Sequence, residues 1–234
     1  MDAVELIVNA AIAHQTLEVH LCNTYTISLT ASDPDLRCAL QRENALNLPD
    51  GVPVALLGRS AGQRSVVRGP TLVREVVAAG ADRGLRHFLF GGGPGIAETM
   101  AERLQELVPT CKIVGVEAPP FTPMSRHDIE ELGSRVRLTM ADIVWIGLGT
   151  PKQDKLVADL AVYFSGPIVP VGAAFDFISG HIPEAPDVLR GSGLEWIFRL
   201  LREPRRLWRR YLFGGLIFLR LVVLNWIPRK ATGA

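Results

Sequence analysis

Cysteine is scarce in this sequence of 234 residues, and its positive and negative charges nearly cancel. The three cysteines, Cys22, Cys38 and Cys111, are odd in number and far apart, which excludes a disulfide framework and a zinc site and favours a reducing cytosol. The formal net charge of +1 gives no sign of a polyanionic partner, so we expect no nucleic-acid binding. Residues 1–5 carry acids where an export signal requires basic residues, and we expect no such signal.

Several catalytic and metal-binding motifs are absent as well. The histidines are scattered without metal-ligand spacing, and the sequence contains no G-x-S-x-G elbow and no Walker A motif. Asp33-Pro34-Asp35 has the Asp-x-Asp pattern that holds a metal in many nucleotide-sugar enzymes. Asp33 also fits a helix N-cap with Pro34 at the first helical position, and we favour that interpretation. We therefore predict no essential metal and no cofactor.

Apolar segments of strand length alternate with segments of helix length through the first part of the chain. Most of the apolar segments are followed by glycine or proline, as is usual where a strand ends. This alternation predicts an α/β fold, a Rossmann-like, mainly parallel sheet with helices on both faces, whose ligands bind at the carboxyl ends of the strands. The predicted strands are 19–22, 86–90, 112–116, 142–146 and 167–171, and the predicted helices are 71–83, 95–107, 125–137 and 152–164.

The composition changes near residue 190, where arginines and aromatic residues become frequent. We interpret residues 191–234 as a basic, amphipathic helical appendage to an α/β core of residues 1–190. Its apolar run 216–227 contains Arg220 and is shorter than the roughly 20 residues that span a bilayer. We expect the appendage to lie on an anionic membrane surface rather than to form a core helix. The residues expected there are Arg205, Arg206, Arg209 and Arg210, with Trp208, Tyr211 and Trp226 at the interface.

A glycine-rich turn between a strand and a helix is the first candidate ligand site. Gly92, Gly93 and Gly95 follow the strand 86–90, where backbone N–H groups at a helix N-terminus can bind a phosphate. Their spacing is not that of the dinucleotide fingerprint. A plain tight turn, with Pro94 near the helix start, fits equally well, and the sequence leaves both interpretations open.

The segment 147–154, G-L-G-T-P-K-Q-D, joins another strand to a helix. Pro151 suits the helix start, so Lys152 and Gln153 lie in the first turn and, with Gly149, face the strand ends. A lysine is unexpected at the positive end of a helix dipole, and an anionic ligand explains it better than solvent does. We therefore favour a functional role for this segment.

Two carboxylates in or after apolar segments are further candidates. Asp50, before Gly51, is placed to act as a general base at a strand end, but an Asp-Gly pair judged alone favours a turn. Asp176 lies in a stretch of small and apolar residues that includes Gly172, where a lone acid must be paired or hydrogen-bonded. Asp176 could bind a ribose or a base edge, or it could cap a neighbouring backbone segment, and the sequence leaves both roles open.

These segments, in this order, resemble the WecG/TagA/CpsF family, glycosyltransferase family 26, over residues 19–211. The most specific matches are G-x-G-x-P-K-Q at 147–153 and G-L-E-W at 193–196. Members of this family transfer a sugar, typically N-acetylmannosamine from its UDP derivative, to a polyprenyl-diphosphate-linked sugar, with inversion and without a metal. The resemblance implies such a transferase for cell-surface polysaccharide or teichoic-acid-type biosynthesis, cytoplasmic and peripheral on the inner face of the cell membrane.

The resemblance also implies roles for individual residues. It implies that Asp50 is the catalytic base and that Gln153 lies in the active site. It further implies that arginines of the appendage close over the diphosphate. The expected substrate-binding residues are Asn23, Gly51, Arg68, Gly92, Gly93, Gly95, Gly149, Pro151, Lys152, Gly172, Asp176, Arg199, Arg206 and Arg209.

The sequence departs from the family pattern in three places. Of Thr-x-Asn after the first core strand, only Asn23 is present. Arg-Val-x-Gly reads Val-Val-Arg-Gly at 66–69, so Arg68 or Arg64 would have to replace the family's arginine. Arg-Ala-Pro begins with Glu184.

Two other functions remain open. The glycine turn followed by Glu117 would suit a nicotinamide-dependent oxidoreductase, although the glycine spacing does not. A non-catalytic nucleotide-sugar-binding or scaffold subunit of a membrane polysaccharide assembly complex would explain the missing arginine. A second copy of the chain also stays open as a partner.

Overall fold

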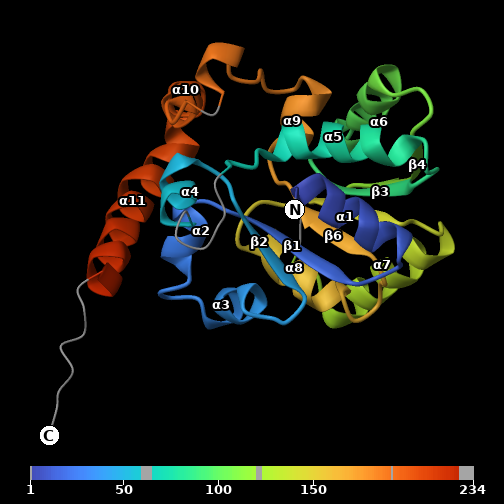
Figure 1. Ribbon diagram of the computed structural model, residues 1–234, viewed down its shortest axis with the longest axis horizontal. Coiled ribbons are helices and arrows are strands. Elements are labelled where there is room, and N and C mark those ends of the chain that lie inside the picture. The colour runs from blue at the N-terminus through green and yellow to red at the C-terminus, as the bar shows by residue number, and fades with distance from the viewer. Residues whose placement is uncertain (1, 59–64, 120–122, 191, 227–234) are drawn as a thin grey trace, which may run out of the picture.

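Six parallel strands form one sheet in the order β2-β1-β6-β5-β3-β4 (Figure 1). The computed structural model describes residues 2–58, 65–119, 123–190 and 192–226, without the side chains of Arg206, Asn225 and Trp226. The predicted α/β class is confirmed. The strands are β1 Leu17–Cys22, β2 Ala45–Pro49, β3 Arg86–Gly91, β4 Lys112–Glu117, β5 Ile143–Gly147 and β6 Pro167–Pro170.

Helices cover both faces of the sheet, as predicted. On one face lie α1 (Ala3–Ile12), α5 (Gly69–Ala81), α6 (Ile96–Leu107) and α9 (Ala174–Ser179), and on the other α3 (Pro34–Leu40), α7 (Arg126–Leu138) and α8 (Lys152–Leu160) (Figure 1).

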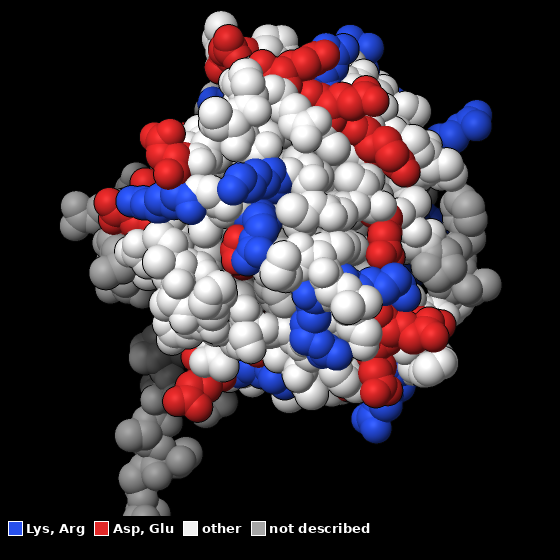
Figure 2. All heavy atoms as spheres, turned by 90° about the vertical axis from the view of Figure 1, so that its right-hand side faces the viewer, with Lys and Arg blue, Asp and Glu red and all other residues white. Residues whose placement is uncertain are grey.

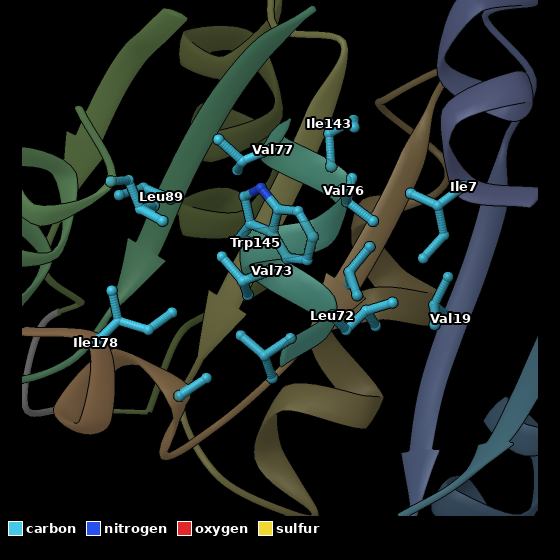
Figure 3. Close-up of a cluster of buried hydrophobic side chains, with 14 of the residues drawn as sticks. Ile7, Val19, Leu72, Val73, Val76, Val77, Leu89, Ile143, Trp145 and Ile178 are labelled. Atoms are coloured by element: carbon cyan, nitrogen blue, oxygen red, sulfur yellow. The ribbon is translucent and has the colours of Figure 1, made fainter. Parts of the chain in front are cut away.

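Side-chain alternation along the strands creates a hydrophobic core on each face, because successive residues of a strand point to opposite sides. In β5, Ile143 and Trp145 enter the core with α5, while Val144 and Ile146 enter the core with α7 and α8. Figure 3 shows Trp145 beside Val73 of α5. Burial on both faces explains why these strands read as continuous apolar runs.

The two ends of the molecule are formed by different elements (Figure 1). Over α6, β4 and α7, charged side chains of both signs are scattered side by side (Figure 2). They include the ion pairs Arg103–Glu106 and Arg135–Glu117, each at 2.9 Å. The opposite end carries α2 (Thr24–Leu29), α4 (Val52–Gly58) and the C-terminal helices (Figure 1).

The C-terminal segment forms α10 (Glu195–Arg202) and α11 (Pro204–Trp226), so the predicted helical appendage is present. α11 begins at Pro204, because proline suits the first turn of a helix. It packs along α2, and Gly214 permits the close approach: a Cβ atom there would lie 3.1 Å from Tyr25 Cδ2. Among the described residues, no helix is both long and apolar enough to cross a bilayer.

The core around β3 contains a fully buried histidine. His87 Nδ1 accepts a hydrogen bond from Trp145 Nε1 at 3.2 Å. His87 Nε2 has no hydrogen-bond partner within the described part of the chain. Burial lowers the pKa of His87 to about 4, against the opposing charge of Asp142. The folded protein therefore holds this histidine neutral.

We expect the free energy of unfolding to decrease as the pH falls from about 6.5 to about 4. In this range the unfolded chain binds a proton at residue 87 that the folded chain does not, which costs at most about 3 kcal/mol at the low end. His87→Gln keeps an acceptor for Trp145 and should flatten this dependence. His127→Gln, on a side chain 78% exposed, should leave it unchanged. Denaturant titrations across the range test this, and equal slopes in the two variants would contradict it.

Candidate active site

A cavity of about 360 Å³ lies at the carboxyl ends of four adjacent strands, β2, β1, β6 and β5. Residues of α10 and α11 line its other side. This is where a parallel sheet places its ligands. The predicted site residues that line the cavity are Asn23, Asp50, Gly51, Arg68, Gly149, Gln153, Gly172 and Arg199.

Asp50 follows directly after β2 and is half-buried in this cavity. Asn23 Oδ1 accepts hydrogen bonds from the backbone N–H groups of Tyr25 and Thr26, so the Asn23 amide is fixed as the N-cap of α2. Its Nδ2 group donates to Asp50 Oδ2 at 3.4 Å. Burial raises the pKa of Asp50, while Arg199 and the bond from Asn23 act in the opposite direction. A carboxylate held in this way can accept a proton.

Gln153 lies in the first turn of α8 and is buried against the cavity. Its Oε1 accepts the Gly149 backbone N–H at 2.9 Å, and Gly172 leaves room for it, since a Cβ there would lie 3.3 Å from Oε1. The amide nitrogen is therefore the end of the side chain left for a ligand. Next to Gln153 in the sequence, the buried Asp154 places its Oδ1 atom 3.1 Å from His20 Nδ1, and this contact connects α8 to β1.

Two arginines of the C-terminal helices enter the cavity from the opposite side. The Arg199 guanidinium lies 5.3 Å from the ring centroid of Phe177, and that of Arg210 lies 4.7 Å from the ring of Tyr25. Burial lowers the pKa of Arg210, and the charge of Arg199 lowers it further. Within the described residues neither arginine forms an ion pair with a carboxylate. Two arginines without a carboxylate partner can bind an anionic ligand. The nearby Asp50 carboxylate can accept a proton from a hydroxyl group bound beside that ligand.

The chain matches the family model of the Glycosyl transferase WecG/TagA/CpsF family over residues 1–232. The chain belongs to this family. The resemblance seen in the sequence motifs is thereby confirmed, and the protein is assigned to the glycosyltransferases. The cavity is thus the candidate active site of a WecG/TagA/CpsF glycosyltransferase.

In this member of the WecG/TagA/CpsF family, Arg68 lines the cavity but its charge is already paired. Its Nε and Nη2 donate to the two carboxylate oxygens of Glu195, each at 2.8 Å, and Nη2 also lies 3.3 Å from Glu184 Oε1. Arg74 binds the other oxygen of Glu184 at 2.8 Å. Arg68 therefore joins α5 to α10. Arg64, the alternative replacement for the family's arginine, lies outside the described residues.

Other predicted site residues are not among those that line the cavity. The glycine turn after β3 packs against the β5 backbone: a Cβ on Gly91 would lie 2.5 Å from Gly147 Cα, and Gly92 N donates to Gly147 O at 3.0 Å. Arg209 is exposed on α11, with its guanidinium 5.2 Å from the Trp208 ring. Arg206 has no described side chain. The predicted residues outside the cavity lining are Gly92, Gly93, Gly95, Pro151, Lys152, Asp176 and Arg209.

Several cavity residues were not among the predicted substrate contacts. Arg210 and Tyr211, expected at a membrane interface, instead line the cavity, and the Tyr211 ring lies 5.7 Å from that of Trp196. The spacing of Leu207, Arg210 and Gly214 on one side of α11 is the signal that could have located Arg210. Tyr25, Phe177 and Glu195 are further examples.

The Asp-x-Asp segment caps a helix, as predicted. Asp33 Oδ1 accepts the Leu36 N–H at 3.0 Å as the N-cap of α3. Lys155 Nζ lies 2.9 Å from Asp33 and 3.5 Å from Asp35. In the part of the chain that the structure describes, no three acidic, histidine or cysteine side chains gather as a metal site. Metal independence itself stays a prediction.

Proposed function

We propose that the protein is an inverting glycosyltransferase that transfers N-acetylmannosamine or a related hexose from a UDP-sugar to a polyprenyl-diphosphate-linked sugar, without a metal. The observation that carries the proposal is a carboxylate with a raised pKa, Asp50, in one cavity with two unpaired arginines, Arg199 and Arg210. The product would serve cell-surface polysaccharide or teichoic-acid-type biosynthesis.

In the proposed reaction, Asp50 accepts the proton of the acceptor hydroxyl while that oxygen attacks the anomeric carbon of the donor. The bond between the anomeric carbon and the phosphate oxygen breaks, and UDP leaves with the electron pair. A single displacement from the opposite face inverts the anomeric centre. Arg199 and Arg210 would stabilise the negative charge of the departing diphosphate by charge-assisted hydrogen bonds. In metal-dependent transferases a bound cation supplies this stabilisation by coordinating the diphosphate.

The proposal is tested by offering UDP-sugars and a short-chain polyprenyl-diphosphate-sugar to the purified protein in excess chelator, with product mass as the readout. We expect transfer to persist in the chelator. Activity that is lost there and restored by magnesium or manganese would show that a metal is required. Binding of UDP-sugars without transfer or hydrolysis would support a scaffold subunit instead.

We further propose that the C-terminal helices bring the cavity to the inner face of the cell membrane. One side of α11 exposes Leu212, Leu216 and Leu219, by 54%, 60% and 59%. Their spacing places them on one stripe of the helix, and the exposed Arg205 and Arg209 lie on the same helix. Such a helix binds anionic lipid surfaces. Because the acceptor's lipid tail stays in the bilayer, the site must approach it.

We expect the triple variant Leu212→Glu/Leu216→Glu/Leu219→Glu to lose binding to anionic vesicles, because it removes apolar contact and adds repulsive charge. These side chains lie outside the cavity, so transfer to a water-soluble acceptor should stay near the wild-type rate. Leu138→Glu, 82% exposed on α7, is the matched control. Sedimentation with vesicles at low and high salt is the measurement, and high salt should weaken wild-type binding. Full binding by the triple variant would refute the membrane contact.

A further inference from the structure

Two arginines that line the cavity, Arg199 and Arg210, each lie over an aromatic ring that comes from a different part of the fold. Arg199 of α10 lies over Phe177 of α9, and Arg210 of α11 lies over Tyr25 of α2. Both rings belong to helices that follow directly from strand ends, and both line the cavity. The C-terminal helices thus supply the charges, and the sheet domain supplies the surfaces on which the charges rest.

A ring holds a guanidinium group without consuming its hydrogen-bond donors. The N–H groups of arginine lie in the plane of the guanidinium, so contact through the face leaves them free to bind a ligand. Arg199 Nε is buried and has no hydrogen-bond partner among the described residues. Arg68 shows the alternative, since Glu195 takes up its donors and its charge. The rings therefore position Arg199 and Arg210 without a carboxylate partner among the described residues.

The rings also offset the repulsion between two cations in one cavity, because the negative face of an aromatic ring attracts a cation. The packing of α11 on α2 sets this geometry for Arg210. Gly214 lies one helical turn beyond Arg210 and touches the same Tyr25 ring, where a Cβ would come within 3.1 Å of Cδ2. The absence of a side chain at 214 therefore lets α11 come close enough for Arg210 to reach Tyr25.

We propose that Tyr25 and Phe177 are positioning residues that seat Arg210 and Arg199 for binding a diphosphate ester. This inference rests on the proposed transferase function, in which that ester is the UDP moiety of the donor. The two rings act through the arginines and take no part in bond making or breaking.

A double-mutant cycle tests the inference, with UDP and inorganic diphosphate as probes and calorimetry as the readout. Tyr25→Leu should weaken the binding of both probes by about 3- to 30-fold, a range that runs from an exposed to a desolvated cation–π contact. Tyr25→Phe keeps the ring and should bind within about twofold of wild type. In an Arg210→Ala background, Tyr25→Leu should have no further effect, because the ring has lost its cation. The equivalent cycle for the other pair uses Phe177→Leu, Phe177→Tyr and Arg199→Ala. This second cycle tests the inference if a Tyr25 variant does not fold.

The outcomes separate this inference from the proposed function. If wild type binds UDP but ring removal weakens it equally with and without the arginine, the rings do not act through the arginines and the inference is wrong. If ring removal weakens UDP but not inorganic diphosphate, the rings contact the nucleoside and the inference is again wrong. If wild type binds neither UDP nor a UDP-sugar and transfers no sugar, the proposed function itself fails.

Discussion

Replacing Asp50 by asparagine should lower kcat by about a hundredfold or more, because the acceptor hydroxyl then has no base to accept its proton. Asparagine keeps the size of the side chain and an acceptor oxygen for Asn23 Nδ2, so the cavity should persist. The affinity for UDP should change little, since the arginines that would bind the diphosphate are unaltered. Steady-state transfer rates and calorimetry with UDP measure the two quantities separately.

The matched control is Asp35→Asn, an exposed acid in α3 outside the cavity, which should retain full turnover. Turnover near the wild-type value in Asp50→Asn would remove Asp50 from the mechanism. A loss of UDP affinity as large as the loss of kcat would instead show that the substitution damages the cavity.

The raised pKa of Asp50 adds a pH signature to this result. Asp50 acts as a base only when ionised, so kcat should fall as the pH drops through its raised pKa, at a higher pH than for an ordinary aspartate. Arg210 lowers the pKa of Asp50 by its positive charge. The acid limb of the kcat profile should therefore move to still higher pH in Arg210→Ala. A pH–rate profile of the two proteins measures the shift, and a shift to lower pH would contradict it.

The residues at strand ends could be predicted from the sequence because the information is local. A parallel sheet places all its carboxyl ends on one edge, so a polar residue or glycine after each apolar run belongs to that edge. Asn23, Asp50, Gly149 and Gly172 were predicted on this basis together with the family resemblance, and all line the cavity.

The glycine turn after β3 shows where local information ends. Glycine indicates that a Cβ does not fit, but it does not reveal what occupies the space. At Gly91, the last residue of β3, the occupant is the neighbouring backbone, because a Cβ there would lie 2.5 Å from Gly147 N and Cα. A Cβ on Gly92 would instead meet the Ile96 side chain, and a Cβ on Gly95 would have no atom within 4 Å. A phosphate-binding turn requires the same residue type. The pairing of β3 with β5 accounts for Gly91, and that pairing is not local. Phosphate binding by Gly92, Gly93 and Gly95 stays a prediction.

The choice between Arg209 and Arg210 depends on non-local packing in the same way. Adjacent residues of a helix point about 100° apart, so the rotation of α11 decides which of the two lines the cavity. Leu207, 1% exposed, and Gly214, against Tyr25, mark the side of α11 that packs on the core. That side carries Arg210, whereas the family resemblance had indicated Arg209. The rotation of α11 follows from its contact with α2, which is far away in the sequence.

Arg210→Ala should lower kcat/KM by about 10- to 150-fold, because a charge-assisted hydrogen bond to the diphosphate contributes about 1.5–3 kcal/mol. Arg210→Lys keeps the charge but loses the planar fork of donors, so it should recover only part of this loss. Transfer from a UDP-sugar to a water-soluble acceptor is the measurement, since it removes any contribution from membrane binding.

Arg209→Ala is the matched control for Arg210→Ala, because it removes the same charge from the adjacent residue of the same helix. The Arg209 guanidinium lies over Trp208 on the exposed side of α11, away from the cavity. With a water-soluble acceptor, Arg209→Ala should stay within about twofold of wild type, a change expected of a surface substitution. On anionic vesicles its binding should weaken by about 1 kcal/mol, the contribution of one basic residue near the surface. Equal losses in the two variants with the soluble acceptor would mean that net positive charge, rather than a guanidinium held in the cavity, supports the reaction.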